Sequence, residues 1–359
     1  MVYDHHKIRE ITTFSIRGAM LKRLLTLATH RIYSLPVIVL MPHSSCNCRC
    51  VMCDIWKANH DKREISVEML AKNVHAFKTI GVREVVLSGG EALLHSNLWK
   101  FCSLLKQNRI RITLLSTGLL LKKHASQIVE NIDNVIVSLD GTQEIHDRIR
   151  NVPNAFVRIS EGIRALRDIN EKFSITGRCV IQRGNYFDFI NIVKSARQIG
   201  LNQISFLAAD VSSNAFNHPD GWSADNIGTV ALTEAETLQF EKIVDTSFKE
   251  LAYEYRTRFI AESKSKIKRL AQYYRAVNKK ADYPRPICNA PWVSAVIESD
   301  GTVLPCFFHK PYGNLNDRNF LDIINSKDAR DFRSNLDMTM NDICRKCVCS
   351  IKLRPYQLL

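Results

Sequence analysis

The sequence contains no apolar run long enough to cross a membrane as a helix, so no membrane-spanning segment is expected. It also shows no signal peptide, because Lys7, Arg9 and Arg17 interrupt any apolar stretch at the N-terminus. Internal repeats and low-complexity tracts are missing as well. We therefore expect a cytoplasmic protein whose eleven cysteines are reduced, which favours metal binding over disulfides.

Motifs that read nucleic-acid bases are missing too, so no nucleic-acid partner is expected despite a net charge of +14. That charge is compatible with an anionic membrane or a phosphorylated substrate, but a soluble protein with a basic surface accounts for it as well. With 359 residues, of which 45% are hydrophobic and 24% charged, the chain is long enough for one large domain and a smaller one.

Short apolar runs rich in β-branched residues recur through the first 210 residues, and helix-like segments fill most gaps between them. This alternation predicts right-handed β–α–β units around a parallel sheet. Six such units fit an α/β fold, a partial (β/α)6 barrel. The expected strands are 37–40, 84–87, 110–115, 135–137, 175–181 and 204–207, and the expected helices include 67–80, 98–108, 125–131, 155–169 and 186–200.

The chain is expected to divide into four segments. Residues 1–34 form a basic amphipathic helical extension, which either packs on the core or lies on a membrane surface. Residues 35–210 hold the barrel, and residues 211–283 form a helical connector or lid that begins with a polar loop. Residues 284–352 form a small α+β domain, in which an Asp-Gly pair between two apolar runs predicts a hairpin.

Cys46, Cys50 and Cys53 follow the first expected strand in a C-x3-C-x2-C spacing. Parallel β/α folds gather functional groups at the C-terminal ends of their strands. A four-iron cluster normally has four thiolate ligands, so three leave one iron open to bind a small molecule. The spacing leaves two alternatives, a structural zinc site completed by His43 and unrelated core cysteines. Three further cysteines are interpreted as structural, namely Cys48, Cys102 and Cys179.

Polar groups also follow the second and fourth expected strands. Gly89 and Gly90 let a backbone approach a ligand closely, and the carboxylate of Glu91 can accept hydrogen bonds from an ammonium group. Ser138 and Arg150 can together bind a carboxylate, because arginine forks onto it and serine donates one more bond. Each motif alone fits ordinary loop glycines or surface polar residues. Beside the cysteine loop, they suit the amino and carboxylate groups of a methionine-like ligand.

Five more cysteines lie in the last segment. Cys288 and Cys306 stand on either side of the expected hairpin turn, and Cys344 and Cys347 form a C-x2-C knuckle. Four thiolates can fill an iron–sulfur cluster or a zinc site, so the spacing keeps a zinc ribbon as the rival interpretation. Cys349 is either a ligand or a bystander.

Taken in order, these motifs resemble the radical S-adenosylmethionine (radical SAM) superfamily, in the subgroup with a C-terminal SPASM or twitch auxiliary-cluster domain. The resemblance covers about residues 36–350. It implies a SAM-binding 4Fe-4S cluster, contacts to the amino and carboxylate groups of SAM, and one auxiliary 4Fe-4S cluster. The resemblance implies that Cys46, Cys50 and Cys53 ligate the SAM-binding cluster. It implies that the contacts to SAM come from Gly89, Gly90, Glu91, Ser138 and Arg150. The implied ligands of the auxiliary cluster are Cys288, Cys306, Cys344 and Cys347.

The sequence departs from the family pattern at Met52, where an aromatic residue is common, and at Ala92, where proline is common. Only five cysteines occur from Cys288 onward, which favours the one-cluster form of the auxiliary domain. Residues 1–34 are too short for the peptide-recognition domain that peptide-modifying relatives often carry.

The resemblance implies an enzyme that reductively cleaves SAM to a 5′-deoxyadenosyl radical, which takes a hydrogen atom from a substrate. We expect a small-molecule substrate, a sugar, aminocyclitol or nucleotide-linked compound, that is oxidised or epimerised. A reductant such as flavodoxin or ferredoxin is expected as partner. A peptide-modifying enzyme is the alternative within the class, and a zinc-binding interaction protein without catalysis is the alternative outside it. The sequence identifies neither the substrate nor a catalytic residue.

Overall fold

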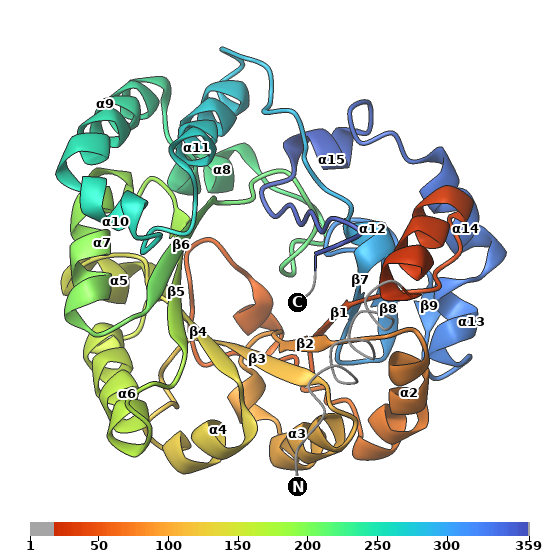
Figure 1. Cartoon of the computed structure of the whole chain (residues 1–359). Helices are drawn as coiled ribbons and strands as arrows, with labels where there is room; N and C mark the ends of the chain where they lie inside the picture. The colour runs from red at the N-terminus through yellow and green to blue at the C-terminus, as the bar shows by residue number, and fades with distance from the viewer. Residues whose placement is uncertain (1–17, 358–359) are drawn as a thin grey trace, which may run out of the picture.

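The structure is a computed structural model that describes residues 18–357. A parallel sheet curves into a partial barrel, as the alternating pattern predicts (Figure 1). The α/β fold class is thereby confirmed. All six expected strands form within one residue of their predicted bounds: β1 (Val37–Leu40), β2 (Glu84–Leu87), β3 (Arg111–Ser116), β4 (Asn134–Ser138), β5 (Ile175–Ile181) and β6 (Gln203–Ala208).

Helices line the outer side of the sheet (Figure 1). Each buries one stripe of apolar residues, as Ile159, Ile163 and Leu166 show for α6. Ser66 caps the first of these helices by accepting a hydrogen bond from the amide of Met69. The outer helices are α2 (Val67–Thr79), α3 (Leu98–Gln107), α4 (Ala125–Asn131), α5 (Gln143–Arg150), α6 (Ala155–Ile169) and α7 (Phe189–Gln198), with short 3-10 turns η1 (Ile55–Ala58), η2 (Ala92–Leu94) and η3 (Tyr186–Asp188).

The C-terminal segment continues the barrel sheet. β7 (Ser294–Ile297) pairs in parallel with β1, and β8 (Thr302–Leu304) and β9 (Gly313–Asn314) follow antiparallel. In the described residues the strand order is β6-β5-β4-β3-β2-β1-β7-β8-β9. The hairpin thus covers the β1 edge, which would otherwise expose unpaired backbone groups. Four helices complete the segment: α12 (Ala290–Val293), α13 (Phe320–Ile324), α14 (Lys327–Asn335) and α15 (Asp342–Lys346).

Alternation along β4 and β5 separates a buried face from a face that borders the barrel interior. Val135 and Val137 are fully buried under the helices. Ile136, Ser138 and Arg178 are only partly buried and line an internal cavity. Ser138 and Arg178 therefore border the place where a ligand can bind.

Residues 211–283 contribute four helices: α8 (Ala224–Val230), α9 (Glu234–Glu250), α10 (Ala252–Arg256) and α11 (Lys264–Val277). The predicted capping box of Thr233 and Glu236 forms at the start of α9. The hydroxyl of Tyr274 on α11 donates to the carbonyl of Ile181 at 2.5 Å and accepts the amide of Ala209 at 3.0 Å. These bonds fasten α11 to the ends of β5 and β6, so α11 forms a wall beside the barrel.

Of the expected N-terminal extension, residues 1–17 lie outside the described residues. Residues 18–29 are helical and pack on the core through Arg23, which donates to the carbonyls of Arg354 and Pro355 at 3.3 and 3.4 Å. Leu21 and Leu24 are exposed on the other face of this helix. No helix in the described part of the chain has the length and apolar character needed to span a bilayer.

Candidate functional site

The loop after β1, which carries the three predicted cluster cysteines, is fixed to the end of α5. The amides of Arg49 and Val51 donate to the last carbonyls of that helix, at 3.1 Å each. Asn59 holds the loop from the other side, because its side chain bonds to both the amide and the carbonyl of Cys46, each at 2.9 Å. The backbone of this loop is therefore positioned by protein contacts before any ligand binds.

The glycine pair after β2 lies directly against this loop. A Cβ atom at Gly90 would stand 2.2 Å from the carbonyl oxygen of Ser45, and one at Gly89 would stand 2.8 Å from that of His43. Gly89 also has φ of +107°, which side chains rarely adopt. The two glycines thus let the end of β2 approach the cysteine loop, and both border the inner cavity.

Glu91, expected to bind an ammonium group, has protein partners instead. Its side chain is 0% exposed and is not among the residues that line the cavity. The carboxylate accepts bonds from the amides of Leu93 (3.1 Å) and Thr117 (2.8 Å) and from the hydroxyls of Ser116 and Thr117. Burial raises the pKa of Glu91 against the opposing effect of these donors. In this geometry Glu91 joins the loop after β2 to the end of β3, and its ammonium-binding role stays a prediction.

Ser138 and Arg150 both line the cavity. Arg150, the last residue of α5, is buried and pairs through Nη2 with Asp140 Oδ2 at 2.5 Å. Burial lowers the pKa of Arg150, but Asp140 and Cys50 raise it, and the net direction is upward. Its Nε atom is buried and has no hydrogen-bond partner among residues 18–357. A buried donor of this kind normally has an acceptor, so Arg150 retains one donor for an anionic ligand.

Two of the three loop sulfurs accept a hydrogen bond from an N–H group, as ligand sulfurs of iron–sulfur clusters commonly do. The pairs are Cys48 N to Cys46 Sγ at 3.5 Å and Arg150 Nη1 to Cys50 Sγ at 3.5 Å. The neighbouring thiol of Cys48 and the guanidinium of Arg150 lower the pKa of Cys50 to about 6 against the effect of burial, whereas burial raises the pKa of Cys53 to about 12.

The five C-terminal cysteines surround a second cavity of about 90 Å³. Two of these sulfurs lie within hydrogen-bond range of N–H groups, and no such bond to the other three is found among residues 18–357. The pairs are Ala290 N to Cys288 Sγ at 3.4 Å and His309 Nε2 to Cys344 Sγ at 3.3 Å.

The zinc alternatives at these two places stay predictions. Within residues 18–357, no three His, Cys, Asp or Glu side chains converge as the ligands of one ion must. His43, the suggested fourth ligand, accepts the Ser45 amide on Nδ1 at 2.8 Å and faces Glu64 with Nε2 at 3.4 Å. At both places the cysteines line cavities.

An inner cavity of about 250 Å³ is bordered by all three loop cysteines and by Cys349 of the second group. Outside it lies an open groove of about 900 Å³ between the segment after the cysteine loop and the C-terminal hairpin. Phe216 and Phe307 border both spaces. Phe216 is in the left-handed region, with φ of 60°, and its carbonyl accepts the amide of Asp54 at 3.1 Å. The polar loop at 211–223 is thus fastened beside the cysteine loop.

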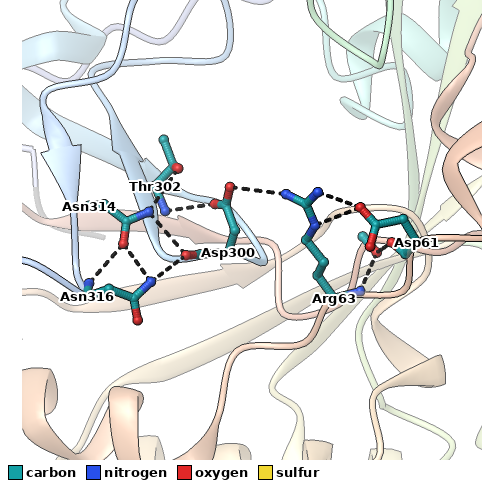
Figure 2. Close-up of polar contacts among 7 residues, drawn as sticks. Asp61, Arg63, Asp300, Thr302, Asn314 and Asn316 are labelled. Atoms are coloured by element: carbon teal, nitrogen blue, oxygen red, sulfur yellow. Dashed lines mark hydrogen bonds and ion pairs between the residues drawn. The ribbon is translucent and has the colours of Figure 1, made fainter.

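One rim of the groove joins the segment after the cysteine loop to the hairpin turn, as Figure 2 shows. Arg63 lies between Asp61, whose carboxylate it contacts through Nε at 3.0 Å, and Asp300 at 3.7 Å. Asp300 in turn accepts the amide of Thr302 at 2.9 Å, and Asn314 donates to its carbonyl at 3.1 Å. This exposed network orders the turn but contributes little stability by itself.

Several residues of the site were not predicted from the sequence. Arg178 had a signal, because it is a charged residue within an otherwise apolar strand. No sequence pattern marks Phe216, Phe307 or His309, because they reach the two cavities only when the connector loop and the last segment fold against the barrel. His146 accepts the amide of Asp140 on Nδ1 at 3.1 Å.

Comparison with family models matches residues 40–206 to "Radical SAM superfamily" and residues 288–348 to "Iron-sulfur cluster-binding domain", named SPASM. The probable GTP 3′,8-cyclase of Saccharolobus islandicus is 26% identical over 197 residues, which cover 54% of this chain and 59% of the relative. The PqqA peptide cyclase of Ruegeria pomeroyi is 26% identical over 271 residues, covering 73% and 64%. The chain thus spans about three fifths of the length of these curated relatives.

Among solved structures, Streptococcus suis SuiB bound to the precursor peptide SuiA superimposes with a TM-score of 0.65 at 16% identity. The match covers 92% of this chain and 75% of SuiB. At this level of identity the likeness establishes a shared fold, including both the barrel and the C-terminal segment.

Proposed function

Because the chain belongs to the radical SAM superfamily and carries a C-terminal SPASM iron–sulfur domain, we propose that it modifies a peptide or protein substrate. The observation that carries this proposal is the open groove of about 900 Å³ outside the cysteine-lined cavity. Its size is near the upper end for small-molecule sites, and it is open along the surface, as an extended peptide requires. The named relatives that cover most of the chain point the same way, since one is a peptide cyclase and one binds a precursor peptide.

The inner cavity suits the cofactors, because the three loop cysteines and the partnerless Nε of Arg150 border it. When bound, a 4Fe-4S cluster and SAM supply one-electron cleavage and hydrogen abstraction. Cys46, Cys50 and Cys53 would hold the cluster. The backbone of Gly89 and Gly90 would lie along SAM.

Charge distribution in the cavity matches an amino-acid ligand. Ser138 and Arg150 would orient its carboxylate, with Asp140 fixing the guanidinium from behind. Because Phe216 and Phe307 stand where groove and cavity meet, they would limit the access of water to the reacting atoms. These two rings pack against each other with centroids 6.0 Å apart, so a substrate side chain would enter past the ring pair while the rest of the substrate stays in the groove.

We assign the second cavity to one auxiliary 4Fe-4S cluster held by Cys288, Cys306, Cys344 and Cys347. The support is that all four cysteines line this cavity, and that Cys288 and Cys344 lie within hydrogen-bond range of N–H groups. Cys349 is then a bystander thiol, and it borders both cavities.

A small-molecule substrate is the second candidate, and a nucleotide is its best-supported form. The GTP 3′,8-cyclase relative favours it, but that match covers only 54% of this chain. A sugar or aminocyclitol, expected from the sequence, has no such support.

The test is substrate-dependent cleavage of SAM under anaerobic conditions, with dithionite as reductant. Short peptides encoded beside the gene are compared with GTP, and peptide masses are recorded. The proposal predicts faster 5′-deoxyadenosine formation and an altered peptide mass. Consumption of GTP with every peptide unchanged would contradict it and support the nucleotide candidate.

A further inference from the structure

His309 stands between the second cysteine cavity and the outer groove and lines both. Its side chain is buried, with 7% of the residue exposed. The ring packs edge-on against Phe332, with centroids 4.9 Å apart. Its Nε2 atom lies 3.3 Å from Cys344 Sγ, which is within hydrogen-bond range for sulfur. Burial and packing therefore fix the position of the imidazole ring and direct its Nε2 atom to Cys344.

The donors at this cavity differ in kind. Cys288 accepts a bond from the backbone amide of Ala290 at 3.4 Å. Cys344 receives its bond from an imidazole. A thiolate that ligates iron has no proton to donate, so Nε2 must carry the hydrogen in that contact. This assigns the tautomer of His309 once Cys344 is a ligand.

We propose that His309 is a positioning residue of the auxiliary cluster, which donates a hydrogen bond from Nε2 to the ligand sulfur of Cys344 and raises the reduction potential of the cluster. The inference rests on the proposed assignment of that cavity to an iron–sulfur cluster. Reduction adds negative charge that is shared by the sulfurs, so an N–H dipole aimed at one of them stabilises the reduced form more than the oxidised form.

The first cysteine loop offers a parallel on the same chain. There the side-chain donor is Arg150, whose Nη1 lies 3.5 Å from Cys50 Sγ. Arg150 carries a full charge and is paired with Asp140, whereas no acidic side chain forms an ion pair with His309 among the described residues. Each site thus has one sulfur whose hydrogen bond can be removed by a single side-chain substitution.

The experiment uses the full chain with Cys50→Ala, so that the auxiliary cluster gives the signal. Into this chain we place His309→Leu, which removes the donor, and His309→Gln, which keeps an N–H group. Iron, sulfide and the midpoint potential of the cluster are measured, the last by redox titration followed by EPR. Phe332→Leu is the matched control, because it changes the packing of the ring and leaves the donor.

His309→Leu is expected to lower the midpoint potential of the cluster by about 59 mV for one electron. A shift of that size corresponds to an about tenfold lower ratio of reduced to oxidised cluster at the same applied potential. His309→Gln should recover at least half of this shift, and Phe332→Leu should change it little. An unchanged potential in His309→Leu with full iron content would overturn the inference. So would loss of the cluster in both His309 variants, or a directly bound nitrogen seen by pulsed EPR in the parent, because either makes His309 a ligand. A parent without iron would instead overturn the cluster assignment itself.

Discussion

Both groups of cysteines can supply thiolates to a metal cluster, but the chain brings the thiols together differently in each. The first takes three thiols from one loop of eight residues, and a buried ion pair of Arg150 and Asp140 lies behind it. The second gathers thiols from 288 to 349 and places one amide and one imidazole beside them. Under the proposed assignment, the first group would leave one cluster position for a ligand, and the second would close its cluster completely.

The acidity of the thiols follows this difference. The Cys48 thiol and Arg150 lower the pKa of Cys50 to about 6, so a thiolate is favoured there before metal binds. At the second site burial raises the pKa of Cys306 to about 11 and that of Cys344 to about 12. Cys53 is the exception at the first site, because burial raises its pKa to about 12. Cluster assembly must therefore release protons at both sites, since metal ligands are thiolates.

The largest effect is expected from a substitution that removes a ligand of the first site. Cys50→Ala removes one of three ligands and the partner of Arg150, so SAM cleavage should fall to background. The measurement is 5′-deoxyadenosine formed with dithionite and SAM. Cys102→Ala, a buried thiol on α3 far from both cavities in the fold, should retain the activity. Cleavage by Cys50→Ala at the parental rate would show that the first cluster is misplaced.

A substitution at the second site should separate the two functions. Cys347→Ala is expected to lower the iron content by about four atoms and to leave SAM cleavage largely intact, because that cavity holds a different cluster. Cys349→Ala is the matched control and should keep all the iron. Equal iron loss in both variants would make Cys349 a ligand and remove the distinction drawn between the two thiols.

The contact between β2 and the cysteine loop can be tested without removing a ligand. Gly90→Ala places a Cβ 2.2 Å from Ser45 O, so the loop must shift, at a cost of about 1–3 kcal/mol in unfolding free energy. Gly228→Ala, where nothing lies within 4 Å, should be neutral or stabilise by about 0.4–1 kcal/mol. Thermal unfolding and iron content are the measurements. An unchanged Tm in Gly90→Ala would show that the close approach is not required.

The smallest effect is expected at the exposed rim of the groove. Arg63→Ala removes the ion pair to Asp300 but no cavity residue of the cysteine loop. Tm should change less than in Gly90→Ala, and the difference should shrink at high salt because exposed charges are screened. SAM cleavage without substrate should match the parent. A loss of that basal cleavage would mean that the rim shapes the inner site as well.

The barrel could be predicted from the sequence because its signals are local. Val37–Leu40 and Ile175–Ile181 are apolar runs whose bounds the structure reproduces, and the first cysteine group lies within one loop. The pairing of β7 with β1 could not be predicted, because the two strands lie more than 250 residues apart. Nothing in either segment indicates which residues of the two strands pair.

Side-chain partners were harder to predict than strands. Glu91 follows two glycines at a ligand-facing edge, yet Thr117 and Ser116 occupy its carboxylate. His309 lies 35 residues from Cys344 along the chain, and only the packing of the hairpin against α15 brings them within 3.3 Å. Such contacts depend on how loops pack and not on periodicity.

The most direct test of two clusters with distinct environments is iron and sulfide analysis of the anaerobically purified full chain. The account predicts brown protein with about eight iron and eight sulfide per chain, from two 4Fe-4S clusters. Colourless protein with stoichiometric zinc would contradict it.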